Sequence, residues 1–235
     1  MGHIWVIGFM STCLGIGLGG GLASFIHRFK RSIGTVYAVC TGLLLGLVSI
    51  EIVPEAIELG NWIIFSVGFS VGVLLFTWMH RCLPSHSRKD HGRNTGIFLA
   101  LVISLHNFPM GVVLGTSEHT DVGVALWQAM LLHNIPEGMV LFTPLCIAGL
   151  RFFSLCILSV FIALPVAAGA YIGQLIGAQH HVVWAFLISL TVGTIYMITM
   201  KEILPESIRR SSPMYTVVIA CVAFGFMAWY LSFLK

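Results

Sequence analysis

Eight long apolar stretches take up most of this chain and limit what it can fold into. They cover roughly 4–26, 33–58, 61–80, 96–116, 122–149, 152–177, 181–208 and 213–234. A helix needs about 20 apolar residues to cross a bilayer. Only 9% of the 235 residues are charged, whereas soluble domains average about 25%. We therefore expect an all-α membrane protein in which a single transmembrane domain over residues 1–235 contains eight helices.

The lysine and arginine residues are distributed unevenly among the connecting loops. The loops after the first, third, fifth and seventh stretches contain Arg28, Lys30, Arg31, Arg81, Arg88, Lys89, Arg93, Arg151, Arg209 and Arg210, and the other connecting loops contain none. Because cytoplasmic loops carry an excess of positive residues, we expect both termini outside and a cytoplasmic loop over 81–95. No positive residue precedes the first apolar run, so we interpret this run as a helix of the fold and not as a secretory signal.

Several classes of function are disfavoured by missing motifs. The six cysteines show no C-x-x-C spacing, so we expect neither a disulfide framework nor a zinc knuckle. No G-x-x-x-x-G-K-[ST] string for ATP binding occurs. The net charge of +3 comes from the cytoplasmic loops, and we expect no nucleic-acid partner and no prosthetic group.

Two pairs of matching strings occur at related places in the chain. His106-Asn-Phe-Pro-Met-Gly111 in the fourth stretch resembles His133-Asn-Ile-Pro-Glu-Gly138 in the fifth, and Glu51-Ile-Val-Pro-Glu in the second resembles Glu202-Ile-Leu-Pro-Glu in the seventh. By the expected topology, the members of each pair run in opposite directions. This pattern indicates inverted-repeat pseudo-symmetry, in which a substrate site lies near the membrane midplane between the repeats.

The matching strings of the fourth and fifth stretches place ionisable side chains in the middle of apolar helices. Such side chains are costly in a membrane and usually mark a functional site. Residues four apart share a helix face, which places Met110 with His106 and Glu137 with His133. An asparagine lies beside each histidine, so the candidate metal ligands are His106, Asn107, Met110, His133, Asn134 and Glu137.

The prolines and glycines of these strings have their own consequences. Pro109 and Pro136 have no N–H to donate to the carbonyls four residues earlier, which adds candidate oxygen ligands. Gly111 and Gly138 permit close approach of a neighbouring helix. Imidazole favours zinc, copper, iron and nickel, so this set of ligands predicts a site for a borderline transition ion. Met110 is either a thioether ligand for softer ions or a packing residue.

At these residues the sequence resembles the ZIP (Zrt/Irt-like protein) family of divalent metal transporters, most closely its bacterial zinc-uptake branch. The resemblance rests on the eight spans, the two His-Asn-x-Pro strings and the Glu-x-x-Pro-Glu strings. It implies a secondary transporter that moves divalent metal into the cytoplasm as one helix bundle moves against another. Zinc is the first expectation, with iron, manganese or cadmium as alternatives. It also implies a multi-pass protein of the plasma membrane (the bacterial inner membrane), in contact with the lipid bilayer, and leaves a homodimer open.

The resemblance further implies a binuclear site between the fourth and fifth spans, with His106, His133 and Glu137 as primary ligands. The sequence departs from the family pattern at two positions. Met110 stands where the fourth-span string usually has Glu, and Leu164 precedes Pro165 where the zinc-uptake branch often has Glu. Fewer carboxylates leave less negative charge to balance a second dication, so our hypothesis is one transported ion per site.

Further polar residues are weaker candidates. Glu51, Glu55, Glu202 and Glu206 either line the pathway, the first two where the ion enters and the last two where it leaves, or are solvated helix ends. Ions could also be captured by loop residues, which are His80, Cys82, His86, His91, Glu118, His119, Asp121, His180 and His181. The competing interpretation of this last group is that loops are simply polar.

Two other functions remain as alternatives at this point. An intramembrane metalloenzyme would need an open coordination position and a general base, for which Glu137 is a candidate, although no H-E-x-x-H string occurs. A family member that senses metal without transporting it is the other, favoured by the missing carboxylates.

Overall fold

The computed structural model describes residues 3–26, 32–82, 91–116, 122–177 and 180–234, and the side chains of 91, 122–129 and 234 lie outside this description. The described residues form helices and no strands. In chain order these helices are α1 (Ile4–Ile26), α2 (Ile33–Leu47), η2 (Val48–Ile52), α3 (Val53–Leu59), α4 (Trp62–Cys82), α5 (His91–Thr116), α6 (Val122–Ile147), α7 (Phe152–Ile176), α8 (His181–Ile198), η3 (Thr199–Ile203), α9 (Leu204–Arg210) and α10 (Pro213–Leu234).

The described helices confirm the expected fold class. Eight of the helical segments are long and apolar enough to cross a bilayer; α2, η2 and α3 together make the second of them, and α8, η3 and α9 the seventh. The expected loop over 81–95 is shorter, because α4 continues to Cys82 and α5 begins at His91. Which side of the membrane holds the termini stays a prediction.

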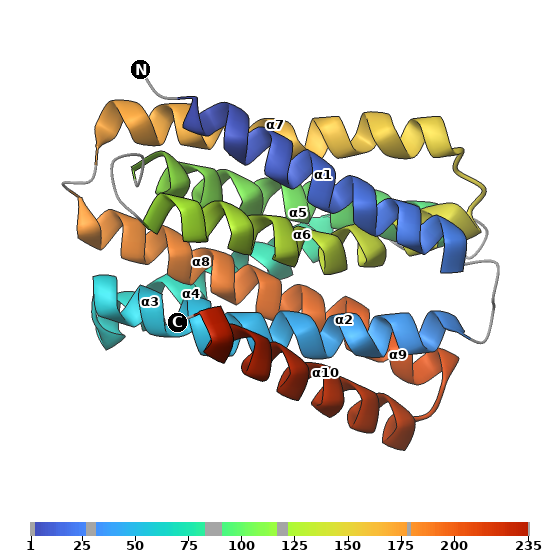
Figure 1. Cartoon of the computed structure of the whole chain (residues 1–235). Coiled ribbons are helices and arrows are strands. Elements are labelled where there is room, and N and C mark those ends of the chain that lie inside the picture. The colour runs from blue at the N-terminus through green and yellow to red at the C-terminus, as the bar shows by residue number, and fades with distance from the viewer. Residues whose placement is uncertain (1–2, 27–31, 83–90, 117–121, 178–179, 235) are drawn as a thin grey trace.

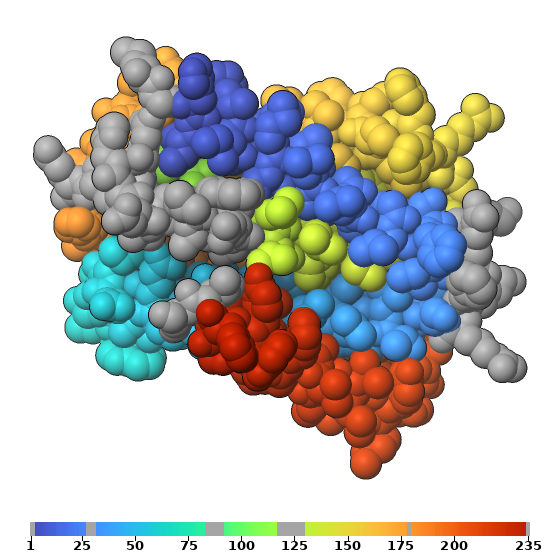
Figure 2. All heavy atoms as spheres, viewed as in Figure 1, coloured from blue at the N-terminus to red at the C-terminus, as the bar shows by residue number. Residues whose placement is uncertain are grey.

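Helices α5 and α6 lie in the middle of the bundle, with α1 and α7 on one side and α2, α8 and α10 on the other (Figure 1). In the most apolar 18-residue stretches of α5 and α6, 72% of the residues are buried, against 17% in α4 and 22% in α10. In the space-filling view, a small part of α6 is visible between α1 on one side and α2 and α10 on the other (Figure 2). The two helices that carry the His-Asn strings are therefore the ones best shielded from lipid.

Large apolar side chains cover the outside of the bundle. They project from α1, α4, α7 and α10, and include Trp5, Leu14, Phe25, Trp62, Trp78, Phe153, Phe161, Leu175, Val222 and Phe233. A soluble protein rarely exposes apolar surface on this scale, whereas a bilayer solvates it. The exposed surface thus supports the assignment made from span length.

Glycines bring helix backbones together on both sides of the centre. A Cβ atom at Gly138 of α6 would collide with the carbonyl oxygen of Ile16 in α1, and one at Gly111 of α5 would collide with that of Val166 in α7. Both glycines belong to the His-Asn strings, so the expected close approach is confirmed. In lipid, the hydrophobic effect does not drive helices together. Close van der Waals packing at small residues has to stabilise their association instead.

The Glu-x-x-Pro-Glu strings form matching local structures. Each contains one π-helical turn, η2 or η3, and the glutamate is the fourth residue of that turn. The N–H of Val53 bonds to the carbonyl of Val48, and that of Leu204 to the carbonyl of Thr199. Proline follows at 54 and 205, where its missing N–H cannot restore the ordinary ladder. Such turns are rare and concentrate at functional sites.

Helices that carry matching strings also pack against partners in a matching way. α2 packs against α10 as α8 packs against α4, and α6 packs against α1 as α5 packs against α7. The overall inverted-repeat symmetry stays a prediction.

The glycine contact can be tested by adding one methyl group. We expect Gly138→Ala to destabilise the protein by about 1–3 kcal/mol, because the new methyl overpacks the α1–α6 contact. Gly21→Ala is the matched control, since nothing lies within 4 Å of a Cβ at that position. Thermal unfolding of the purified protein in detergent, followed by circular dichroism, measures both. Equal melting temperatures for the two variants would contradict the contact.

Candidate metal centre

A histidine and a glutamate from neighbouring helices meet in the interior of the bundle. Nε2 of His106 in α5 lies 3.1 Å from Oε1 of Glu137 in α6. The residues are only 1% and 4% exposed, so water screens this pair little. Both helices continue through their prolines, which keeps the two side chains on regular helical segments.

The other nitrogen of the His106 ring also faces an acceptor. Its Nδ1 lies 3.3 Å from the carbonyl oxygen of Val102. A hydrogen on Nε2 would point at the Glu137 carboxylate, and one on Nδ1 would point at the carbonyl of Val102. Metal binding at Nε2 would replace the proton there, because a ligating histidine must be deprotonated.

Three buried oxygen atoms of the two His-Asn strings lack a hydrogen-bond partner among the described residues. They are Oε2 of Glu137 and the Oδ1 atoms of Asn107 and Asn134. The amide nitrogens of both asparagines are engaged: Asn107 donates to the carbonyl of Ile162, and Asn134 donates to that of Met130 at 2.6 Å and to Thr12 at 3.4 Å. Buried polar atoms are normally paired. These oxygens are therefore available to a cation.

Two cavities lie at opposite ends of the helices that carry the pair. The first, here called the Glu51 cavity, has a volume of about 20 Å³ and is lined by Leu47, Glu51, Ile52, Glu55, Met110, Val113, Met130, His133 and Ile188. Its lining includes the C-terminal half of α5 and the N-terminal half of α6. Glu51 reaches it from the π-helical turn η2.

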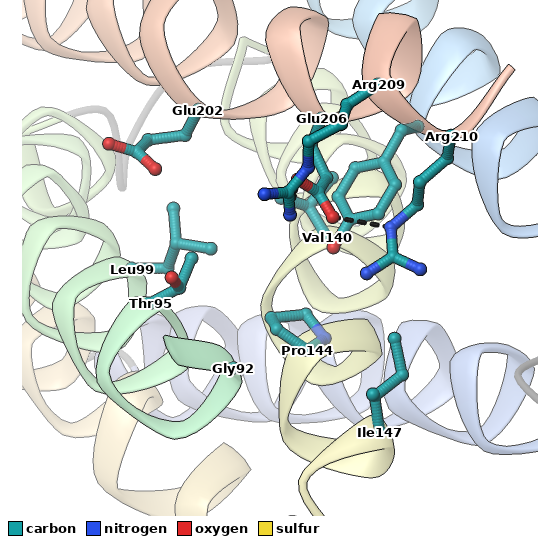
Figure 3. Close-up of a pocket in the computed structure, with 11 residues that line it drawn as sticks. Gly92, Thr95, Leu99, Val140, Pro144, Ile147, Glu202, Glu206, Arg209 and Arg210 are labelled. Atoms are coloured by element: carbon teal, nitrogen blue, oxygen red, sulfur yellow. Dashed lines mark hydrogen bonds and ion pairs between the residues drawn. The ribbon is translucent and has the colours of Figure 1, made fainter. Parts of the chain in front are cut away.

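The second, here called the Glu202 cavity, has a volume of about 130 Å³ and is lined by Tyr37, Gly92, Thr95, Leu99, Val140, Pro144, Ile147, Glu202, Glu206, Arg209 and Arg210. Figure 3 shows Glu202 and Glu206 on the α8–α9 side, across from Thr95 of α5 and Pro144 of α6. His106 and Glu137 come between the two cavities along both central helices. The bundle thus has a polar cavity on each side of a buried ion pair.

The structure assembles only part of the predicted ligand set. It joins His106 to Glu137 across two helices. His133, which precedes Glu137 by one helical turn, interacts electrostatically with the same carboxylate. It is buried and also lines the Glu51 cavity together with Met110 and Glu51. Among the described residues, no three His, Cys, Asp or Glu side chains are close enough together to hold a metal ion. A centre containing both histidines stays a prediction.

The carboxylates proposed for the pathway occupy both cavities. Glu51 and Glu55 line the first, and Glu202 and Glu206 line the second. Glu206 forms ion pairs with Arg209 and Arg210, the latter drawn as a dashed line in Figure 3. Each proposed pair of carboxylates therefore lines one cavity.

The proposed loop histidines have varied positions. His80 lies in the last turn of α4 and not in a loop; its Nε2 is 3.1 Å from Oε1 of Glu202, and its ring packs against Phe76 and Phe98. His180 and His181 are exposed at the start of α8, and Cys82 is exposed at the end of α4. The side chain of His91 and the residues His86, Glu118, His119 and Asp121 lie outside the described part of the chain.

Sequence reasoning missed three participants. Thr12 of α1 and the carbonyl of Ile162 in α7 orient the two asparagines, and only the fold could reveal contacts so distant in sequence. Met130 lines the Glu51 cavity with His133. Its position three residues before His133 places the two on one helix face, and that spacing could have identified it.

The His106–Glu137 pair predicts a non-additive effect on stability. His106→Ala leaves a buried carboxylate without its partner, which we expect to cost about 3–5 kcal/mol. Adding Glu137→Gln removes the uncompensated charge, so the double variant should be more stable than His106→Ala alone. Thermal unfolding without added metal measures this. A double variant whose loss equals the sum of the single losses would argue against the pair.

Comparison with known proteins identifies the family of the chain. The model of the ZIP zinc transporter family matches residues 79–231, more than half of the chain, and the matched part includes both central helices. No curated protein matches the chain. Members of this family are transporters and not enzymes. The chain therefore belongs to the ZIP family of multi-pass membrane proteins, whose members transport divalent metal ions.

Proposed function

We propose that this protein moves divalent transition-metal ions, zinc first among them, into the cytoplasm through the buried site at His106 and Glu137. The observation that carries the proposal is this pair, together with three buried oxygens of the same two strings that have no hydrogen-bond partner among the described residues, and a cavity lined by carboxylates toward each end of the two helices. A packing role would explain the pair. It would not explain the oxygens of Asn107 and Asn134, which are buried at a cost unless something binds them.

The chemistry of the available atoms supports a borderline ion. An imidazole nitrogen, a carboxylate and two amide oxygens form a mixed set of nitrogen and oxygen donors. Zinc, iron and manganese accept such sets, whereas magnesium and calcium are usually held by oxygen alone. A cation bound between His106 and Glu137 would balance the negative charge of the Glu137 carboxylate.

The difference in cavity size supports a direction and a state. By the positive-inside pattern, the Glu202 cavity faces the cytoplasm and the Glu51 cavity faces outside. The inner cavity, at about 130 Å³, is larger than the outer one, at about 20 Å³, as expected for an inward-facing conformation. An inward membrane potential contributes about 4.6 kcal/mol per 100 mV for a dication, and this is sufficient to drive uptake without ATP.

Helix packing supports a two-body movement. α1, α5, α6 and α7 pack mainly among themselves, and α2, α3, α4, α8, α9 and α10 do the same. The two groups meet where α5 packs on α8 and α6 on α2. Displacement along these contacts would open one cavity while closing the other. Because an opening on both sides serves passage and not detection, this arrangement favours transport over sensing.

The number of ions remains a separate part of the proposal. Leu164 is 47% exposed on the outside of α7, so a carboxylate there would not face His106. Of the two departures from the family pattern, only Met110 therefore bears on the site. One missing carboxylate still leaves Glu137 as the sole acid of the two His-Asn strings, which favours one ion per site.

Uptake of zinc into proteoliposomes tests the transport proposal. We expect His106→Ala and Glu137→Ala to abolish uptake, because each removes a ligand at the central site, and His133→Ala to slow it at the outer cavity. Leu164→Ala is the control, since its side chain faces outward. Normal uptake by Glu137→Ala would refute the site.

Bound metal per chain tests the stoichiometry. We expect purified protein to retain one tightly bound zinc ion after dialysis, and Met110→Glu to increase this number by supplying a second acid. Elemental analysis of both proteins at equal concentration gives the ratio. Two tightly bound ions in the unaltered protein would contradict the one-ion hypothesis.

A further inference from the structure

Two methionines line the Glu51 cavity, and only one of them belongs to the matching strings. Met110 comes from α5 and Met130 from α6. They are 7% and 0% exposed and belong to one buried cluster with Ile4, Leu114 and Val166. For packing in this cluster alone, leucine would serve as well as methionine. What distinguishes these two side chains is that they also line a cavity with His133 and Glu51.

The cavity has the size of a single ion. Its volume is about 20 Å³, and a cavity needs about 10–15 Å³ to hold one water molecule. A metal ion that enters has to shed most of its hydration shell and take ligands from the walls. Small hard ions such as magnesium release water reluctantly, so the size alone disfavours them.

The walls offer a defined set of donors. Met130 and His133 are three residues apart and share a face of α6, Met110 faces them from α5, and Glu51 and Glu55 enter from η2 and α3. Among the described residues, no lysine or arginine lines the cavity. The lining is therefore negative when both acids are ionised, and it combines oxygen and imidazole donors with two thioethers.

We propose that Met110 and Met130 are specificity-determining residues whose sulfur atoms contact the metal ion in the Glu51 cavity. Thioethers bind soft ions and contribute little to hard ones. The protein then takes cadmium and zinc in preference to manganese and magnesium at this point. The inference rests on the proposed function for its role in transport, but the site itself can be tested without transport.

Competition in proteoliposomes tests the selectivity. We expect the double variant Met110→Leu/Met130→Leu to lower the cadmium-to-manganese uptake ratio by about tenfold, the smaller end of the losses seen when support for a bound metal is removed. Leucine keeps the apolar volume, so packing is preserved. Met139→Leu is the matched control, because Met139 is a partly buried residue of the same helix that packs against a different cluster. An unchanged ratio in the double variant would overturn the proposal.

X-ray absorption on selenomethionine-labelled protein loaded with cadmium alone tests the contact directly. Selenium distinguishes methionine from the six cysteines. We expect selenium in the first shell of cadmium in the unaltered protein and in Met139→Leu, and none in the double variant. Absence of selenium in the unaltered protein would overturn the inference. If liposomes take up no metal at all, the proposed transport fails, whereas this spectrum still decides whether the sulfur atoms bind.

Discussion

Backbone contact at glycine is the constraint on which the rest of this structure depends. Gly138 lets α6 touch α1, and Gly111 lets α5 touch α7. In lipid, helices gain little by hiding apolar side chains from one another, so they associate where small residues let backbones approach. Because each glycine lies only a few residues from its histidine, the same contacts that build the bundle also fix the depth and the orientation of the candidate metal ligands.

These contacts help to explain why ionisable groups can be held at the centre. A charged pair in a low-dielectric interior is tolerated only if its geometry is good and its remaining atoms are satisfied. His106 meets the first requirement through Glu137 and Val102. The second requirement is not met at three oxygens. Incomplete satisfaction in a well-packed centre is what a site awaiting a cation would show.

Much of the fold could be predicted from the sequence, because the length and the apolar composition of a span are local properties. The bounds of α1 and the His-Asn string that ends at Gly138 could be identified without knowing which helices pack against them. The site was harder to predict. Helical spacing placed Glu137 with His133, but it could not show that the packing of α5 against α6 brings His106 to the same carboxylate. Met130 lies outside the matching strings and acquires its role only because η2 and α5 close a cavity beside it. Such relations depend on how helices are packed, which periodicity does not report.

The ion pairs of the Glu202 cavity have a consequence for release. Glu206 is already bound by two guanidinium groups, and Glu202 lies against His80. A carboxylate that is already paired with neighbouring side chains attracts a passing cation only weakly. Conduction requires binding weak enough to let the ion leave. In the Glu202 cavity the two arginines balance the two acids, so a dication would pass into the aqueous phase and would not be retained. Turnover would then be limited at the centre of the bundle and not at the cytoplasmic end.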